Sequence, residues 1–156
     1  MGKIKVGDAA PAFSGLTTEG DAVALADFAG QKLVLYFYPK DDTPGCTKQA
    51  CSLRDHNAEI RAKGAAILGV STQDQASHRR FTEKYGLNFS LLADVDGQVA
   101  TCYGALGGGG LKSIAMKALG LASRVTFIVD ESVHIQHIIE DPNCANHAEE
   151  VLALLL

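Results

Sequence analysis

The hydrophobic and polar positions divide the chain into apolar blocks separated by polar, glycine-marked turns. Largely apolar runs span residues 33–38, 65–70 and 124–130, a pattern typical of strands covered on both faces. A fourth run, 133–139, follows after the short turn 130–132, so the last two strands are expected to form a hairpin.

Helical patterns fill the segments between and after these strands. Residues 44–63 predict one helix that ends at Gly64, and residues 75–85 predict another that ends at Gly86, since glycine favours helix ends. A last helix is expected from Asn146, which has a capping-box partner three residues on. The buried face of the first helix carries Ala50, Leu53, Asn57 and Ile60 at 3-4-3 spacing.

The order strand, helix, strand implies a parallel pair joined by a right-handed crossover. We therefore expect one α/β domain over residues 1–156, with a length in the usual range for a single domain. The only low-complexity stretch is the glycine run 107–110, which we interpret as a surface loop. It is not a phosphate loop, because no Gly-Lys-Ser/Thr follows it.

Composition narrows the class of protein. The chain has 156 residues, 47% of them hydrophobic, and a net charge of −4, which excludes a disordered chain and argues against nucleic-acid binding. No apolar run is long enough to span a membrane, and the N-terminus lacks the apolar core of a signal peptide. We expect a cytoplasmic protein, in which cysteines are more often catalytic or metal-binding than structural.

Cys46 is the first candidate for chemistry. It follows the apolar run 33–38, and Thr43 and Pro44 provide an N-cap and a first helical residue just before it. A thiolate in the first turn of a helix is favoured by the helix dipole and by unpaired backbone N–H groups. The alternative is a buried, unreactive cysteine.

Cys51 lies five residues beyond Cys46. In an intact helix this spacing turns the two side chains by about 140° and separates them by about 7.5 Å of rise, which is too far for a disulfide. The two thiols can therefore react with each other only if the helix unwinds, and Cys51 as an ordinary helix residue remains an alternative.

Other candidate ligands and thiols are weaker. Cys102 is expected to pack as a small apolar residue, whereas Cys144 is either an exposed thiol or an alternative partner for Cys46. The cysteine and histidine spacings do not form a zinc motif, so no metal is expected. His56 and His78 are expected on solvated helix surfaces. Met116, Leu119 and Leu121 are expected to pack in the core, or to form a small apolar patch near the site.

The chain resembles a known family of proteins. The pattern Pro39-x-x-x-Thr43-x-x-Cys46 is similar to the peroxiredoxin active site, and residues 43–55 resemble the branch called PrxQ or bacterioferritin comigratory protein. Segments 7–13, 69–72, 87–94 and 124–130 resemble the family in the same order. The resemblance implies a thioredoxin-like fold, with a central mixed sheet flanked by helices.

The resemblance also implies roles for single residues. Cys46 would be the peroxidatic cysteine, Arg124 would stabilise its thiolate and the leaving oxygen, and Thr43 would hydrogen-bond at the same oxygens. Pro39 would shield the thiolate, and Cys51 would resolve the sulfenic acid through an intramolecular disulfide. Peroxides would be the substrates and thioredoxin or a similar dithiol the reductant, with no cofactor.

The chain departs from the family pattern in two places, and two rival functions are considered. Gln49 stands where many relatives carry Glu, and residues 107–123 match no pattern of the family. A thiol-disulfide oxidoreductase is disfavoured because Cys-x-x-Cys is absent, and a redox sensor that uses Cys46 is separable only by turnover with an electron donor. No dimer-forming arm is visible, so a monomer is expected.

Overall fold

The computed structural model describes residues 4–106 and 120–155. In chain order its elements are β1 (Ser14–Thr17), β2 (Ala22–Ala24), η1 (Leu25–Phe28), β3 (Lys32–Phe37), α1 (Pro44–Asp55), α2 (Asn57–Ala62), β4 (Ala65–Ser71), α3 (Gln75–Tyr85), β5 (Ser90–Ala93), α4 (Gln98–Cys102), β6 (Val125–Val129), β7 (Ile135–Ile139), η2 (Cys144–Asn146) and α6 (His147–Leu154).

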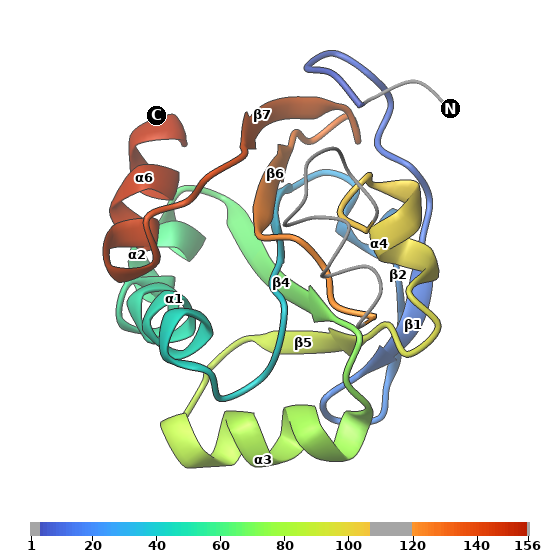
Figure 1. Cartoon of the computed structure of the whole chain (residues 1–156). Helices are drawn as coiled ribbons and strands as arrows, with labels where there is room; N and C mark the ends of the chain where they lie inside the picture. The colour runs from blue at the N-terminus through green and yellow to red at the C-terminus, as the bar shows by residue number, and fades with distance from the viewer. Residues whose placement is uncertain (1–3, 107–119, 156) are drawn as a thin grey trace.

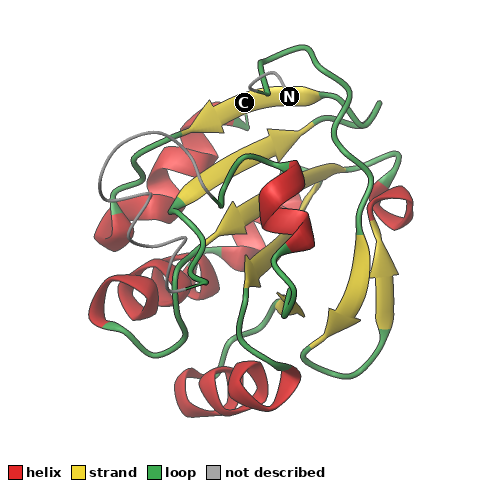
Figure 2. Cartoon of the chain, turned by 45° about the vertical axis from the view of Figure 1, so that its right-hand side comes forward, coloured by secondary structure: helices red, strands yellow, loops and turns green. Residues whose placement is uncertain are grey.

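The strands of the described residues form one mixed sheet in the order β2-β1-β5-β4-β3-β6-β7 (Figure 2). β3 pairs in parallel with β4, and β4 in parallel with β5, whereas β6 runs antiparallel to both β3 and β7. The parallel β3–β4 pair and the final hairpin confirm the topology expected from the apolar runs. The mixed sheet confirms the expected fold class.

Two apolar clusters pack against opposite faces of the sheet, because successive side chains of a strand point to opposite sides. On one face, Val34 and Tyr36 pack with residues of α1, α2, α3 and α6. On the other face, Leu33 and Leu35 pack with residues of α4 and of the N-terminal segment. Figure 1 shows α1, α2 and α6 together on one side and α4 on the other. The central strands are therefore buried on both faces, as their continuous apolar sequence predicted.

The expected helix 44–63 is wrong in one respect, because it is broken into α1 and α2 at His56. The His56 ring nitrogen Nδ1 lies 2.9 Å from the carbonyl oxygen of Ser52. The backbone N–H of His56 donates instead to the carbonyl of Leu53, at 3.3 Å. A side chain that bonds the carbonyl four residues back replaces a backbone bond of the helix, so the helical ladder ends there.

The expected capping of the last helix by Asn146 is also wrong. Asn146 makes no side-chain cap bond. Asn143 accepts hydrogen bonds from the N–H groups of Ala145 and Asn146 instead, and so begins the short η2 turn that leads into α6. The helix ends at Gly64 and Gly86 are confirmed, and both glycines have positive φ, which glycine adopts at little cost.

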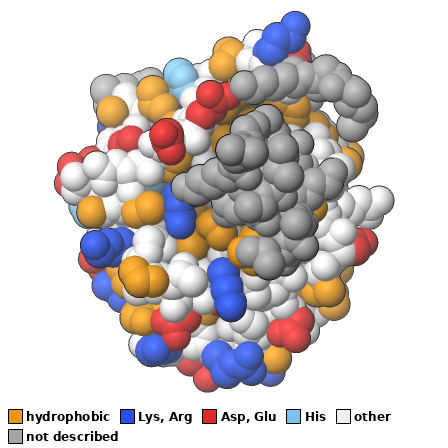
Figure 3. Space-filling model, viewed as in Figure 1, with side chains coloured by type: hydrophobic (Ala, Val, Ile, Leu, Met, Phe, Trp, Pro, Cys, Tyr) orange, Lys and Arg blue, Asp and Glu red, His pale blue; other side chains and the backbone are white. Residues whose placement is uncertain are grey.

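None of the helices that the structure describes is both long and apolar enough to cross a membrane. On the face shown in Figure 3, basic and acidic side chains are interspersed. The glycine run 107–110, Met116 and Leu119 lie outside the described residues, so the expectations for them have no structural counterpart. Leu121 is described and is partly buried.

Candidate active site

Cys46 lies in the first turn of α1, which follows the carboxyl end of β3 after the loop 38–43. Thr43 is the N-cap residue with extended backbone, and Pro44 is the first helical residue, as expected. Only 1% of Cys46 is exposed, and its neighbours in the apolar cluster include Tyr36 and Ala50. Its position at the helix start confirms the sequence prediction. Its near-complete burial is what the alternative, a buried and unreactive cysteine, predicted.

Arg124 distinguishes this site from an apolar cysteine pocket. Its Nη2 donates to the sulfur of Cys46 at 3.2 Å, and its Nη1 donates to Oε1 of Gln49 at 2.7 Å. The guanidinium reaches Cys46 because β6 begins next to Arg124 and pairs antiparallel with β3, with Val125 opposite Phe37. The sulfur of Cys46 is therefore in direct contact with a cationic side chain.

The site contains polar atoms that have no partner among the described residues. These atoms are Nε2 of the fully buried Gln49 and the hydroxyl oxygen of Tyr36. Burial raises the pKa of Tyr36 well above its usual value, and the nearby Cys46 raises it further. The hydroxyl therefore keeps its proton. Tyr36 and Gln49 therefore keep unused hydrogen-bond donors in the same buried region as Cys46. An oxygen atom entering this region could accept hydrogen bonds from them.

Thr43 stands at the N-cap position as expected, but its side chain does not cap the helix. Its hydroxyl donates to the carbonyl of Lys40 at 3.0 Å and makes no cap bond. Pro39 is partly buried, and its carbonyl accepts a hydrogen bond from Nε2 of Gln73 at 3.3 Å. Both residues therefore help to shape the loop before Cys46.

A buried network that the sequence reasoning missed anchors this loop. One oxygen of Asp41 lies 2.7 Å from Nδ1 of His78 and 2.8 Å from the hydroxyl of Ser77, and the other accepts from Tyr38 at 2.6 Å. His78 is fully buried, so its expected place on a solvated helix surface is wrong. Its Nε2 lies 3.0 Å from the carbonyl oxygen of Leu92, a contact that helical periodicity alone could not reveal.

Asp42 ties the same loop to the end of α3. It has a φ of 59°, a conformation that a residue other than glycine adopts only when its surroundings hold it. Its carboxylate accepts hydrogen bonds from Lys84 at 2.8 Å and from Tyr85 at 2.6 Å. These two bonds lower the pKa of Asp42, and they join the loop to the C-terminal end of α3.

The other cysteines are all free thiols. Cys51 is partly buried on the intact helix α1, which is the arrangement that the spacing predicted. Cys102 is partly buried and packs against the apolar cluster that contains Tyr103, as expected. Cys144 lies close to the site: its sulfur is 3.7 Å from the point that a β-carbon on Gly45 would occupy.

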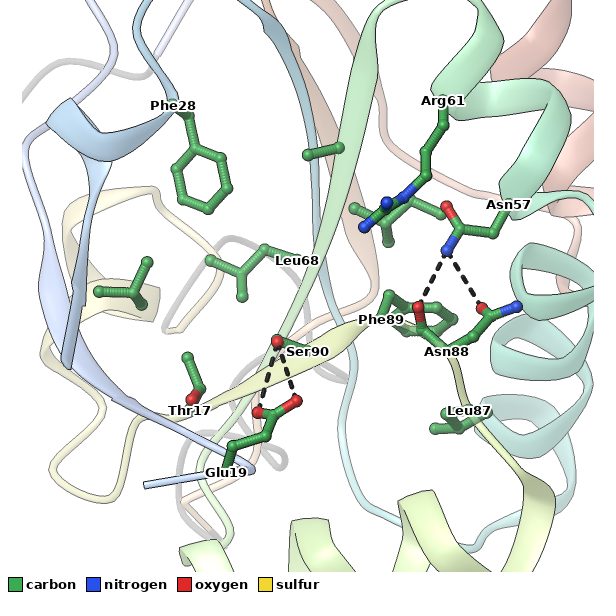
Figure 4. Close-up of a pocket in the computed structure, with 13 residues that line it drawn as sticks. Thr17, Glu19, Phe28, Asn57, Arg61, Leu68, Leu87, Asn88, Phe89 and Ser90 are labelled. Atoms are coloured by element: carbon green, nitrogen blue, oxygen red, sulfur yellow. Dashed lines mark hydrogen bonds between the residues drawn. The ribbon is translucent and has the colours of Figure 1, made fainter. Parts of the chain in front are cut away.

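Among the described residues, no group of histidine, cysteine or carboxylate side chains could hold a metal ion. A cavity of about 460 Å³ lies at the other end of the sheet from Cys46, beside the starts of β4 and β5. In Figure 4, Arg61 and Asn57 line one side of it and Phe28 and Leu68 the other. Cys46 does not line this cavity.

Comparison with known proteins agrees with the resemblance found in the sequence. Residues 6–138 match the AhpC/TSA family. Peroxiredoxin Bcp of Escherichia coli is 43% identical over 152 residues, which cover 97% of this chain and 96% of the relative.

Solved structures agree as well. The crystal structure of PrxQ from Xylella fastidiosa has a TM-score of 0.89 at 26% identity and covers 99% of this chain and 97% of that one. The bacterioferritin comigratory protein of Xanthomonas campestris, described for its alkyl peroxide reduction activity, has a TM-score of 0.83 at 31% identity and covers 92% of this chain and 89% of that one. The chain therefore belongs to the AhpC/TSA family, as a thiol peroxidase with the thioredoxin-like fold that resembles the Bcp and PrxQ proteins.

Proposed function

We propose that Cys46 is the peroxidatic cysteine of this thiol peroxidase. The contact of 3.2 Å between Nη2 of Arg124 and the Cys46 sulfur carries the proposal, because a thiolate is the nucleophile in thiol chemistry and a guanidinium stabilises it. Since Cys46 is only 1% exposed, the substrate needs a reacting end as small as a hydroperoxide. Hydrogen peroxide and small organic hydroperoxides meet this requirement.

In the first step the Cys46 thiolate attacks one peroxide oxygen. An S–O bond forms and the O–O bond breaks, so the sulfur is oxidised by two electrons to sulfenic acid and the second oxygen leaves as water or an alcohol after taking up a proton. Arg124 stabilises the charge on the leaving oxygen. Thr43 lies within one turn of Cys46, and its hydroxyl donates to the carbonyl of Lys40, so we assign its oxygen to accepting a hydrogen bond from the peroxide. Pro39 is assigned to shielding the thiolate from water.

In the second step the Cys51 thiol attacks the Cys46 sulfur, an S–S bond forms and water leaves. Both thiols lie on the intact helix α1, so its first turns must unwind for this step. A dithiol protein of the thioredoxin type then reduces the disulfide by exchange and returns both cysteines to thiols. We further propose that the chain acts as a single domain and as a cytoplasmic monomer. The relative from Xanthomonas campestris supports alkyl hydroperoxides among the substrates.

The test is a coupled assay with thioredoxin, thioredoxin reductase and NADPH. Cys46→Ser should abolish peroxide consumption, whereas Cys102→Ser, a control at a partly buried cysteine in α4, should leave it unchanged. Activity that survives in Cys46→Ser would show that another cysteine is the nucleophile. Oxidation of Cys46 without turnover in wild type would favour a redox sensor instead.

A further inference from the structure

A third thiol lies at the edge of the site around Cys46. Cys144 begins η2, and its sulfur lies 3.7 Å from the point that a β-carbon on Gly45 would occupy. Nη2 of Arg124 lies 3.1 Å from the same point and 3.2 Å from the Cys46 sulfur. Gly45 precedes Cys46 directly in the chain, so both sulfurs border one small region around a single guanidinium.

Because residue 45 is glycine, it places no side chain against Arg124 and Cys144. Any larger residue would place a β-carbon in contact with the guanidinium and with the Cys144 sulfur. The first turn of α1 therefore adds no side chain from residue 45 beside the Cys144 sulfur.

Fixed elements hold Cys144 in this place. Asn143 caps η2 by accepting from the N–H groups of Ala145 and Asn146, and its own N–H donates to Glu150 at 2.8 Å. The N–H of Ala148 donates to the hydroxyl of Ser52 at 3.0 Å, which ties α6 to α1. Cys144 therefore faces the active-site helix in the folded arrangement itself.

The two possible partners of Cys46 require different motions. Cys51 lies on the same helix, so a bond to it requires α1 to unwind from its start through Cys51. Cys144 lies on η2, which packs against α1, so a bond to it does not require α1 to unwind as far as Cys51. The second motion breaks fewer helical hydrogen bonds.

We propose that Cys144 is a second resolving thiol of this enzyme. Its thiol attacks the Cys46 sulfenic acid, the S–O bond breaks, an S–S bond forms and the hydroxyl leaves as water after taking up the thiol proton. Arg124 Nη2 and the buried, unpartnered Nε2 of Gln49 are the donors available to the departing oxygen. This inference rests on Cys46 as the peroxidatic cysteine and extends the resolving step to a second partner.

The test compares Cys51→Ser with the double variants Cys51→Ser/Cys144→Ser and Cys51→Ser/Cys102→Ser. Each reduced protein receives one equivalent of hydrogen peroxide and is then alkylated for thiol counting, dimedone labelling and peptide mapping. We expect Cys51→Ser to lose two thiols and to yield a Cys46–Cys144 peptide within one chain. The variant that also lacks Cys144 should lose one thiol and be labelled by dimedone at Cys46, whereas the variant that also lacks Cys102 should behave like Cys51→Ser.

The inference is overturned if Cys51→Ser takes up as much dimedone as the variant that also lacks Cys144. A Cys46–Cys144 link between two chains, visible as a dimer in non-reducing electrophoresis, would overturn it as well. Failure of the proposed function looks different: Cys46 would then resist peroxide in wild type and in all three variants.

Discussion

Replacement of Arg124 by glutamine tests the central contact of the site. The change removes the donor that lies 3.2 Å from the Cys46 sulfur and the bond of 2.7 Å to Gln49. A hydrogen bond to a charged group contributes about 1.5–3 kcal/mol, and each 1.4 kcal/mol corresponds to about a tenfold change in rate. We therefore expect Cys46 to react with peroxide about 10- to 100-fold more slowly.

The assay is stopped-flow mixing of reduced enzyme with hydrogen peroxide in a single turnover. Arg79→Gln is a matched control, because Arg79 is exposed on α3 and makes no contact with Cys46. Arg124→Lys should fall between the two, because it keeps the charge and loses the planar pair of donors. A rate for Arg124→Gln that matches that of the control would refute the assignment.

Three further changes probe the surroundings of the site. Gly45→Ala should slow the reaction with peroxide, because its β-carbon would lie 3.1 Å from Nη2 of Arg124 and displace the guanidinium; a wild-type rate in stopped flow would contradict this. Gly69→Ala should lower stability by about 1–3 kcal/mol in thermal unfolding, because its β-carbon would lie 2.7 Å from Leu91 and 2.8 Å from Tyr36; an unchanged melting temperature would count against it. Burial lowers the pKa of His147, so the unfolded chain binds a proton that the folded chain does not, and stability should decline as pH falls below about 6.5. His147→Gln should reduce that decline in urea unfolding, and equal slopes for the two proteins would show that His147 is not its source.

The fold shows where sequence patterns succeed and where they fail. β3, β4 and β6 lie in the middle of the sheet and are apolar on both faces, so their composition alone marks them. β1, β2 and β5 have only three or four residues each, too few for a clear apolar run, and they were not predicted. The break at His56 depends on a hydrogen bond between its ring nitrogen and a backbone carbonyl. Helical periodicity does not predict this bond.

Some features of the site also follow from the local sequence, whereas others depend on the fold. The sequence by itself determined that Cys46 begins a helix after a buried strand, because Thr43 and Pro44 are local signals. It also placed Cys51 out of bonding range, because helical spacing is fixed. Only the tertiary structure decided which groups meet the sulfur. Arg124 is 78 residues away in the chain, and Cys144 is further still. Their approach depends on the antiparallel register of β6 with β3 and on the packing of η2 against α1, which are contacts between distant segments that no local pattern specifies.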